Sequence, residues 1–406
     1  MAFCSQYSNR DRKNDHHRVE YILKREVSPC FLLQLEFLVI RLTEYKEGFI
    51  GMEAETVSDE DTFHIAEQMR KKLKGIIPDF EIELKAELAQ EILRLKKEKN
   101  AVILGHNYME PVLYHSIPDY VGDSLQLSSI ASKTEADIIV FCGVWFMGET
   151  AKILNPHKTV IVPSREAGCS LAEGINRNDL IELKKKFPGV PVVSYVNTYA
   201  DTKAESDYCC TSGNAGKVLT HIFKQGHKAV IFVPDEYLAK NTASELNVDY
   251  FFPDEITMEE IKSRMREVVI GWKARCEVHE LFKPEDVDRV REQYPGVKIL
   301  AHPECPPEVI QKVDFSGSTQ GMLDYVKKHP KDRIALFTEC AMGDNIQAEF
   351  PELEVVQACS LRCKHMNLIT LEQTLESLQK IQYQVELPNE IVEQAKQPIQ
   401  RMIEIR

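Results

Sequence analysis

The chain changes its hydrophobic period once, and this change is the first guide to its fold. Over residues 61–74 and 79–100, apolar side chains recur every three or four positions, as at Leu84 and Leu88. This spacing predicts two amphipathic helices. From residue 100 onward, short apolar runs bounded by turn residues alternate with helical stretches. That alternation is typical of buried parallel strands joined by helices.

The short apolar runs predict nine strands in three sets of three. We expect them at 100–106, 137–143 and 159–163, at 191–197, 228–234 and 247–253, and at 297–303, 333–339 and 353–359. Their starting points lie 37 and 22 residues apart in the first set, 37 and 19 in the second, and 36 and 20 in the third. A fixed period indicates a repeated unit. We therefore predict three similar α/β domains over residues 61–190, 191–296 and 297–406.

Both ends of the chain add segments outside this repeat. Residues 1–60 follow no clear pattern, so we expect a poorly ordered extension, with Met52 as an alternative start. Near the other end, Thr370 and Gln373 match a capping box that predicts a helix to about residue 383. Pro388 then precedes a closing helix at 389–405. No low-complexity linker separates the three units, so we expect them to pack tightly.

Composition and charge narrow the class of protein. With 406 residues, 43% hydrophobic and 28% charged, the chain is neither disordered nor collagen-like. Its formal charge of −13 argues against nucleic acid or an anionic membrane as the main partner, because such binding depends on Lys and Arg. No apolar run reaches the roughly 20 residues that span a bilayer. The run at 31–42 lies late for a signal peptide, so we expect a cytoplasmic protein.

Cysteine usage points to a metal group and leaves its kind open. The eleven cysteines are odd in number and contain no CxxC pair, which disfavours a disulfide framework. One cysteine follows the third predicted strand of each unit: Cys169, Cys276 and Cys363. Zinc would take a fourth protein ligand in a structural site. An iron–sulfur cubane held by three thiolates would leave one iron free to act as a Lewis acid. The residues alone do not choose between the two.

Polar side chains mark the end of the first strand in each unit. They are His106 and Tyr108, Tyr195 and Asn197, and His302 and Glu304. A hydroxyl beside a glycine follows each pair after 17 or 18 residues, at a predicted helix start: Ser124, Ser212 and Thr319. Ligands bind at the carboxyl ends of parallel strands, and helix N-termini favour anions. We therefore predict one anion pocket shared by the three units. The alternatives are ordinary N-caps and, for His302 and Glu304, a surface turn in place of an acid–base pair.

Long motifs follow one another from about residue 84 to residue 405. They are GHNYMEPVLYHSIPDYVGDSLQLS, CGVWFMGETAKILNP, PSREAGCSLA, SYVNTYADTKAESD, AHPECPPEV, FSGST and KHMNLITLEQTLESL. In this order they resemble the quinolinate synthase family of NAD biosynthesis. The resemblance implies an α/β fold of three similar three-layer αβα domains with small parallel sheets around a pseudo-threefold axis, plus N-terminal and C-terminal helices. Residues before about 60 lie outside it.

The resemblance also implies an activity and a cofactor. The enzyme, a transferase, would condense iminoaspartate with dihydroxyacetone phosphate to quinolinate and release phosphate and water. A [4Fe–4S] cluster would be held by Cys169, Cys276 and Cys363, with its open iron as the Lewis acid. The source of iminoaspartate implies a functional link to L-aspartate oxidase or aspartate dehydrogenase. Two alternatives are an iron–sulfur hydro-lyase acting on another small anion and a non-catalytic iron–sulfur sensor.

Family site residues fall on the strand ends and helix starts already described. The resemblance implies catalytic roles for Tyr108, His302 and Glu304. It implies substrate binding by His106, Ser124, Tyr195, Asn197, Ser212 and Thr319. Some members carry a CxxCxxC run near the third ligand, whereas this chain has only Cys359 and Cys363 in a CxxxC arrangement. This departure from the family pattern leaves a redox role for Cys359 open.

Overall fold

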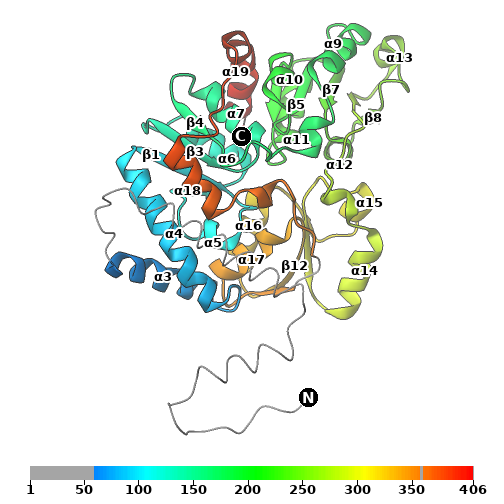
Figure 1. The fold of residues 1–406 in the computed structure, drawn as a ribbon. Helices are drawn as coiled ribbons and strands as arrows, with labels where there is room; N and C mark the ends of the chain where they lie inside the picture. The colour runs from blue at the N-terminus through cyan, green and yellow to red at the C-terminus, as the bar shows by residue number, and fades with distance from the viewer. Residues whose placement is uncertain (1–58, 357–359, 406) are drawn as a thin grey trace, which may run out of the picture. The chain divides into compact units, whose positions relative to one another are not determined.

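Three parallel β-sheets, one in each successive third of the chain beyond residue 100, organise the protein (Figure 1). The computed structural model describes residues 59–356 and 360–405. In the first sheet the order is β2-β1-β3-β4, formed by β1 (Ala101–His106), β2 (Tyr120–Gly122), β3 (Ile138–Cys142) and β4 (Thr159–Ile161). The third sheet repeats this order as β11-β10-β12-β13, formed by β10 (Lys298–Ala301), β11 (Phe315–Ser316), β12 (Arg333–Phe337) and β13 (Glu354–Val356). The predicted α/β class with three similar units is confirmed.

The middle sheet has the same order with one strand added at its edge. It runs β6-β5-β7-β9-β8, formed by β5 (Val192–Tyr195), β6 (Tyr208–Cys210), β7 (Ala229–Val233), β8 (Asp249–Phe251) and β9 (Val268–Ile270). The prediction that 247–253 is the third strand of this unit is wrong, because β9 takes that place beside β7. Both β8 and β9 have three residues, so the sequence does not show which of them pairs with β7. Every strand pair is parallel, and all five residues of β7 are buried, as helices on both faces require.

The helices follow the predicted alternation with the strands. Before and within the first unit they are α3 (Asp59–Leu73), α4 (Asp79–Glu98), α5 (Pro111–Tyr114), α6 (Ser124–Ala131), α7 (Trp145–Leu154), α8 (Ser170–Glu173) and α9 (Arg177–Lys186). In the second unit they are α10 (Ala200–Ala204), α11 (Ala215–Lys224), α12 (Glu236–Leu246), α13 (Met258–Ser263), η1 (His279–Leu281) and α14 (Pro284–Gln293). The remaining ones are α15 (Pro307–Ile310), α16 (Thr319–Lys328), α17 (Cys340–Glu349), η2 (Met366–Leu368), α18 (Leu371–Lys380) and α19 (Asn389–Glu404). None of the helices in the described ranges is long and apolar enough to cross a membrane.

The two C-terminal helices bind the units to one another. Thr370 and Gln373 form the predicted capping box at the start of α18, which packs on α4. The closing helix α19 lies beside α7 and α10 (Figure 1), and so contacts the first and second units. The side-chain amide of Asn214, at the start of α11, donates to the carbonyls of Met402 (2.9 Å) and Ile405 (2.7 Å). The tight packing predicted for the units is observed here.

Some predictions stay open. The predicted boundaries between the three domains remain predictions, because the units share a continuous hydrophobic core. The predictions for residues 1–58, including the alternative start at Met52, and for Cys359 lie outside the described residues.

Candidate active site

The carboxyl ends of β1, β5 and β10 meet at one pocket, and hydrogen bonds cross between the sheets there. The Tyr195 hydroxyl, at the end of β5, donates to Glu304 Oε1, just after β10, at 2.6 Å. The Asn107 amide, just after β1, donates to Thr319 Oγ1 at the start of α16, at 2.9 Å. The three units therefore face one centre, which strand spacing alone could not establish.

All twelve site residues predicted from the sequence line this pocket. They are His106, Tyr108, Ser124, Cys169, Tyr195, Asn197, Ser212, Cys276, His302, Glu304, Thr319 and Cys363. The pocket contains about 730 Å³ not occupied by protein atoms, part of it open to solvent. The lining shows where the residues lie, while the individual roles stay predictions.

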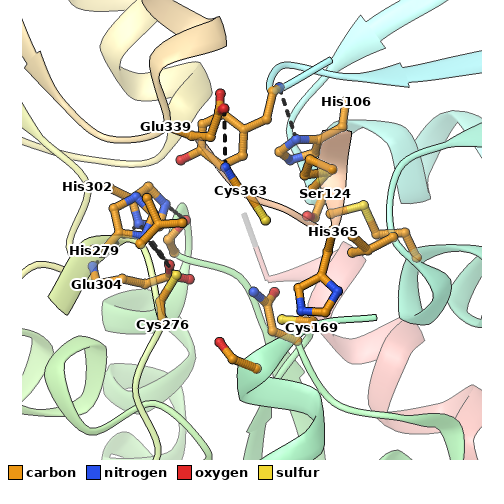
Figure 2. Close-up of a pocket in the computed structure, with 18 of the residues that line it drawn as sticks. His106, Ser124, Cys169, Cys276, His279, His302, Glu304, Glu339, Cys363 and His365 are labelled. Atoms are coloured by element: carbon orange, nitrogen blue, oxygen red, sulfur yellow. Dashed lines mark hydrogen bonds and ion pairs between the residues drawn. The ribbon is translucent and has the colours of Figure 1, made fainter. Parts of the chain in front are cut away.

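The three cysteines enter the pocket from three separate loops, which follow β4, β9 and β13 (Figure 2). The loops share one backbone arrangement: in each, the carbonyl of Cys169, Cys276 or Cys363 accepts from the N–H four residues further on, at 3.0 Å. Burial raises the pKa of the Cys169 thiol to about 12, that of Cys363 to about 11, and that of Cys276 well above its usual value. In each loop, hydrogen bonds from the backbone N–H groups two and three residues after the cysteine lower the thiol pKa and so oppose the effect of burial. A bound cation would therefore be needed to hold these thiols as thiolates at neutral pH.

The donors in this pocket fit a thiolate-bound metal group. All three thiols are free of disulfides. They are also close enough to interact, because Cys363 raises the pKa of Cys169 and Cys169 raises that of Cys276. A second donor set shares one of them: the ligand atoms of Cys276, His279 and Glu304 all lie within 4.8 Å of one another. Cys276 thus belongs to both arrangements.

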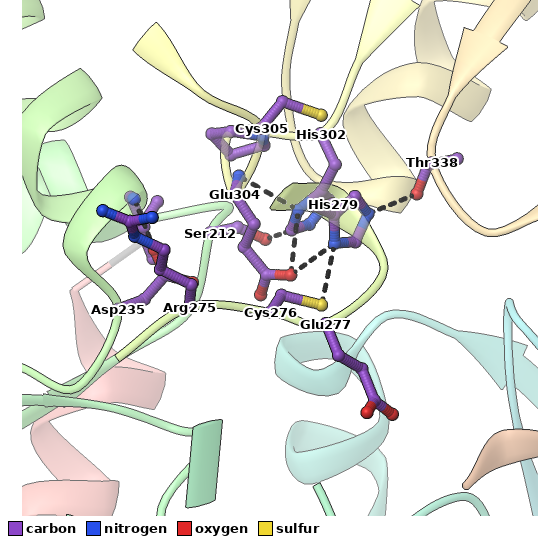
Figure 3. A network of polar contacts seen from close by, with 12 residues as sticks. Ser212, Asp235, Arg275, Cys276, Glu277, His279, His302, Glu304, Cys305 and Thr338 are labelled. Carbon is purple, nitrogen blue, oxygen red and sulfur yellow. Dashed lines mark hydrogen bonds and ion pairs between the residues drawn. The ribbon is translucent and has the colours of Figure 1, made fainter. Parts of the chain in front are cut away.

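Glu304 is the centre of a buried polar network (Figure 3). Its Oε2 lies 2.7 Å from Nδ1 of His279, and the same nitrogen lies 3.2 Å from the Cys276 sulfur. The rings of His279 and His302 stack with their centroids 4.7 Å apart. His302 in turn places Nε2 3.1 Å from Ser212 Oγ.

Burial and neighbouring groups set the charges of this network. Burial opposes ionisation of Glu304, but the imidazoles of His302 and His279 and the hydroxyl of Tyr195 outweigh it and lower its pKa. Burial lowers the pKa of His302 to about 3 and that of His106 to about 4. Burial also raises the pKa of Tyr108 well above its usual value. At neutral pH these shifts leave Glu304 as a carboxylate, His302 and His106 as neutral imidazoles, and Tyr108 as a neutral phenol.

The hydroxyl residues predicted at helix starts do not themselves cap the helices. Ser124 and Thr319 are the first residues of α6 and α16, and Ser212 lies just before α11. The caps are Asp123, Asn214 and Ser318. Capping by the preceding residue leaves the Ser124 and Thr319 hydroxyls on the pocket wall.

Sequence reasoning missed several residues that line the pocket. His279 is one helical turn beyond Cys276, and His365 is two residues beyond Cys363. Glu339 lies at the end of the second strand predicted for its unit, 333–339, which is β12 in the structure, and burial raises its pKa to about 7. Its place at a strand end is the sequence signal that could have found it. Asp123, which stands between Gly122 and Ser124, also lines the pocket and was not predicted.

The fold and the pocket together define an α/β enzyme with a thiol-lined active site at the carboxyl ends of three parallel sheets. Comparison with known proteins gives the particular family. Residues 90–404 match the family described as quinolinate synthetase A protein, and the chain belongs to this family.

Curated relatives cover most of the chain. Quinolinate synthase 2 of Mesorhizobium japonicum is 46% identical over 334 residues, which are 82% of this chain and 96% of that protein. Quinolinate synthase of Agrobacterium fabrum is 47% identical over 316 residues, 78% of this chain and 85% of that protein. Quinolinate synthase of Sinorhizobium fredii is 45% identical over 346 residues, 85% and 89% of the two chains.

Proposed function

We propose that this chain is the enzyme that forms quinolinate for NAD biosynthesis by condensing iminoaspartate with dihydroxyacetone phosphate, with release of phosphate and water. Family membership supports the reaction. The observation that carries the proposal is the meeting of three thiol-bearing loops and a buried Glu–His network at one pocket. L-Aspartate oxidase or aspartate dehydrogenase would supply the iminoaspartate.

Cys169, Cys276 and Cys363 would hold a [4Fe–4S] cluster in this pocket. The shared backbone arrangement of the three loops supports this set over the Cys276–His279–Glu304 set, which draws on only one of them. When bound, the cluster would supply a Lewis-acidic iron that favours loss of hydroxide during dehydration. Every other step is proposed for side chains of this chain.

Both substrates are anionic, and the pocket wall offers them neutral donors. Ser124, Ser212 and Thr319 present hydroxyls, while Asn197 and the neutral His106 add an amide and an imidazole. Each exposed helix end adds only about 0.3–1 kcal/mol for an anion, so several donors must act together. A pocket of this kind reconciles a chain charge of −13 with negative substrates, since the local field opposes the net charge.

Glu304 is proposed as the group that takes and returns protons. It is ionised, and its oxygens already accept from Tyr195 and lie beside His279. His302 would assist as a neutral imidazole fixed by Ser212. Tyr108 keeps its proton, with its hydroxyl 2.5 Å from Thr338 Oγ1, and would donate to a leaving oxygen.

Product analysis tests this proposal. Anaerobically purified protein with a reconstituted cluster should convert iminoaspartate and dihydroxyacetone phosphate into quinolinate, identified by mass spectrometry. The Cys276→Ser variant should lose both cluster iron and product. Absence of quinolinate from cluster-loaded protein would reject the proposal and favour a hydro-lyase or a sensor.

A further inference from the structure

The residues that directly follow the three cysteines contact one another. They are Ser170, Glu277 and Lys364. Ser170 Oγ accepts from the backbone N–H of Glu277 at 3.2 Å and donates to the carbonyl of Arg275 at 3.4 Å. One hydroxyl therefore joins the loop of the first cysteine to both neighbours of the second.

Glu277 joins the second loop to the third. Its Oε2 lies 2.9 Å from the Lys364 ammonium, and its Oε1 lies 3.4 Å from Nε2 of His365. The contacts thus link the first loop to the second and the second to the third, although the loops follow strands of three different sheets.

These contacts act on the positions of the thiols, because their charges do not favour thiolates. The negative charge of Glu277 disfavours a thiolate at Cys363, so its carboxylate does not promote metal binding directly. Lys364 compensates that charge. The contacts instead hold the three loops in place before a ligand binds. Loops that are already fixed lose less conformational freedom when a ligand bridges them.

We propose that Ser170, Glu277, Lys364 and His365 form a latch that sets the positions of the three thiols before the metal cluster binds. The latch rests on the proposed function, because it serves the same three cysteines. Its members are proposed as positioning residues, and three of them, Ser170, Glu277 and His365, also line the pocket. Its effect should be on how readily the cluster is acquired and how slowly it is lost.

Cluster retention tests the latch. Glu277→Gln and Ser170→Ala, each reconstituted anaerobically, should lose cluster absorbance to an iron chelator about fivefold faster than wild type, the equivalent of about 1 kcal/mol. The double exchange Glu277→Lys with Lys364→Glu should return the rate toward wild type. The matched control is Lys72→Met with Glu349→Gln, which removes a similarly exposed ion pair at 2.6 Å outside the pocket.

Two measurements keep the outcomes distinct. The melting temperature of the cluster-free protein should be the same in the latch variants and wild type. Wild-type loss rates in Glu277→Gln, or an equal acceleration in the Lys72–Glu349 control, would overturn the latch. Full iron and sulfide content in Cys276→Ser would instead reject the proposed cluster ligands and leave the latch without a purpose.

Cadmium offers a readout that needs no iron or sulfide. Titration of the cluster-free protein with Cd²⁺ should give a thiolate-to-cadmium absorption band in wild type. Glu277→Gln, which keeps all three thiols, should show the same band with about fivefold weaker binding. Equal affinity in the two proteins would show that the thiols are positioned without the latch.

Discussion

Replacing Glu304 by glutamine is the most direct test of the buried network. Glutamine has almost the same shape as glutamate, so its side-chain carbonyl can still accept the hydrogen bond from the Tyr195 hydroxyl. In the wild type this bond to Glu304 Oε1 is 2.6 Å long. It removes the negative charge and places an amide against Nδ1 of His279, which lies 2.7 Å from Oε2 in the wild type. The change therefore removes the proton acceptor and leaves the pocket shape intact.

The size of the effect follows from the role proposed for the carboxylate. A positioned acid–base group contributes about 10²–10⁴ in rate. At about 1.4 kcal/mol for each factor of ten, this is about 3–5 kcal/mol in activation free energy. We expect kcat to fall by that factor with a small change in KM. The reason is that Glu304 is proposed to transfer protons, whereas other residues bind the substrate anions. Cluster content should stay at the wild-type level, because none of the three thiols changes.

Steady-state quinolinate formation, with iron and sulfide measured on the same samples, checks this prediction. Glu339→Gln is the matched control, since Glu339 is also a buried carboxyl on the pocket wall, and burial raises its pKa to about 7. We expect less than a tenfold loss of kcat in that variant. A loss below tenfold in Glu304→Gln with full cluster content would refute the proposed proton transfer. A loss of cluster would show that Glu304 acts through the metal site.

Three further predictions concern stability. Lys203 is fully buried and donates to the Thr198 carbonyl in the loop after Tyr195. Lys203→Met should therefore lower the free energy of unfolding by about 1–3 kcal/mol and raise KM. An unchanged KM would refute the link between Lys203 and this loop. Burial raises the pKa of Glu110 from 4.5 to about 7, so the folded state binds the extra proton and stability falls as pH rises between those values. Glu110→Gln should therefore stabilise by about 2–3 kcal/mol at pH 8 and by almost nothing at pH 4, as thermal melts at the two pH values would show. Asn214→Ala, which frees the carbonyls at the end of α19, should lower the melting temperature and increase proteolysis of that helix, whereas unchanged cleavage would contradict the proposed anchoring.

The strands predicted from sequence lie in apolar runs bounded by turn residues. The five apolar residues of β3 and of β7 gave clear signals. The three-residue strands β4, β8 and β13 were also predicted, because each lies within a longer apolar run. The middle unit was misread because β8 and β9 are equally short, and the sequence does not show which of them pairs with β7.

The site was predictable where chemistry followed a strand end and unpredictable where it depended on packing between units. His302 and Glu304 were found because they follow β10 directly. The contact between Glu304 and His279 could not be read from the sequence, because it depends on how the second and third units pack. The catalytic role of His302 remains a prediction.

The separation of the three thiol-bearing loops along the chain has a consequence for assembly of the site. Cys169 and Cys363 lie 194 residues apart, and Cys276 lies between them. The three loops follow strands of three different sheets, so the sulfurs come together only when all three sheets have formed and packed. A ligand that bridges the three sulfurs would therefore bind the assembled protein and not a folding intermediate that lacks one sheet.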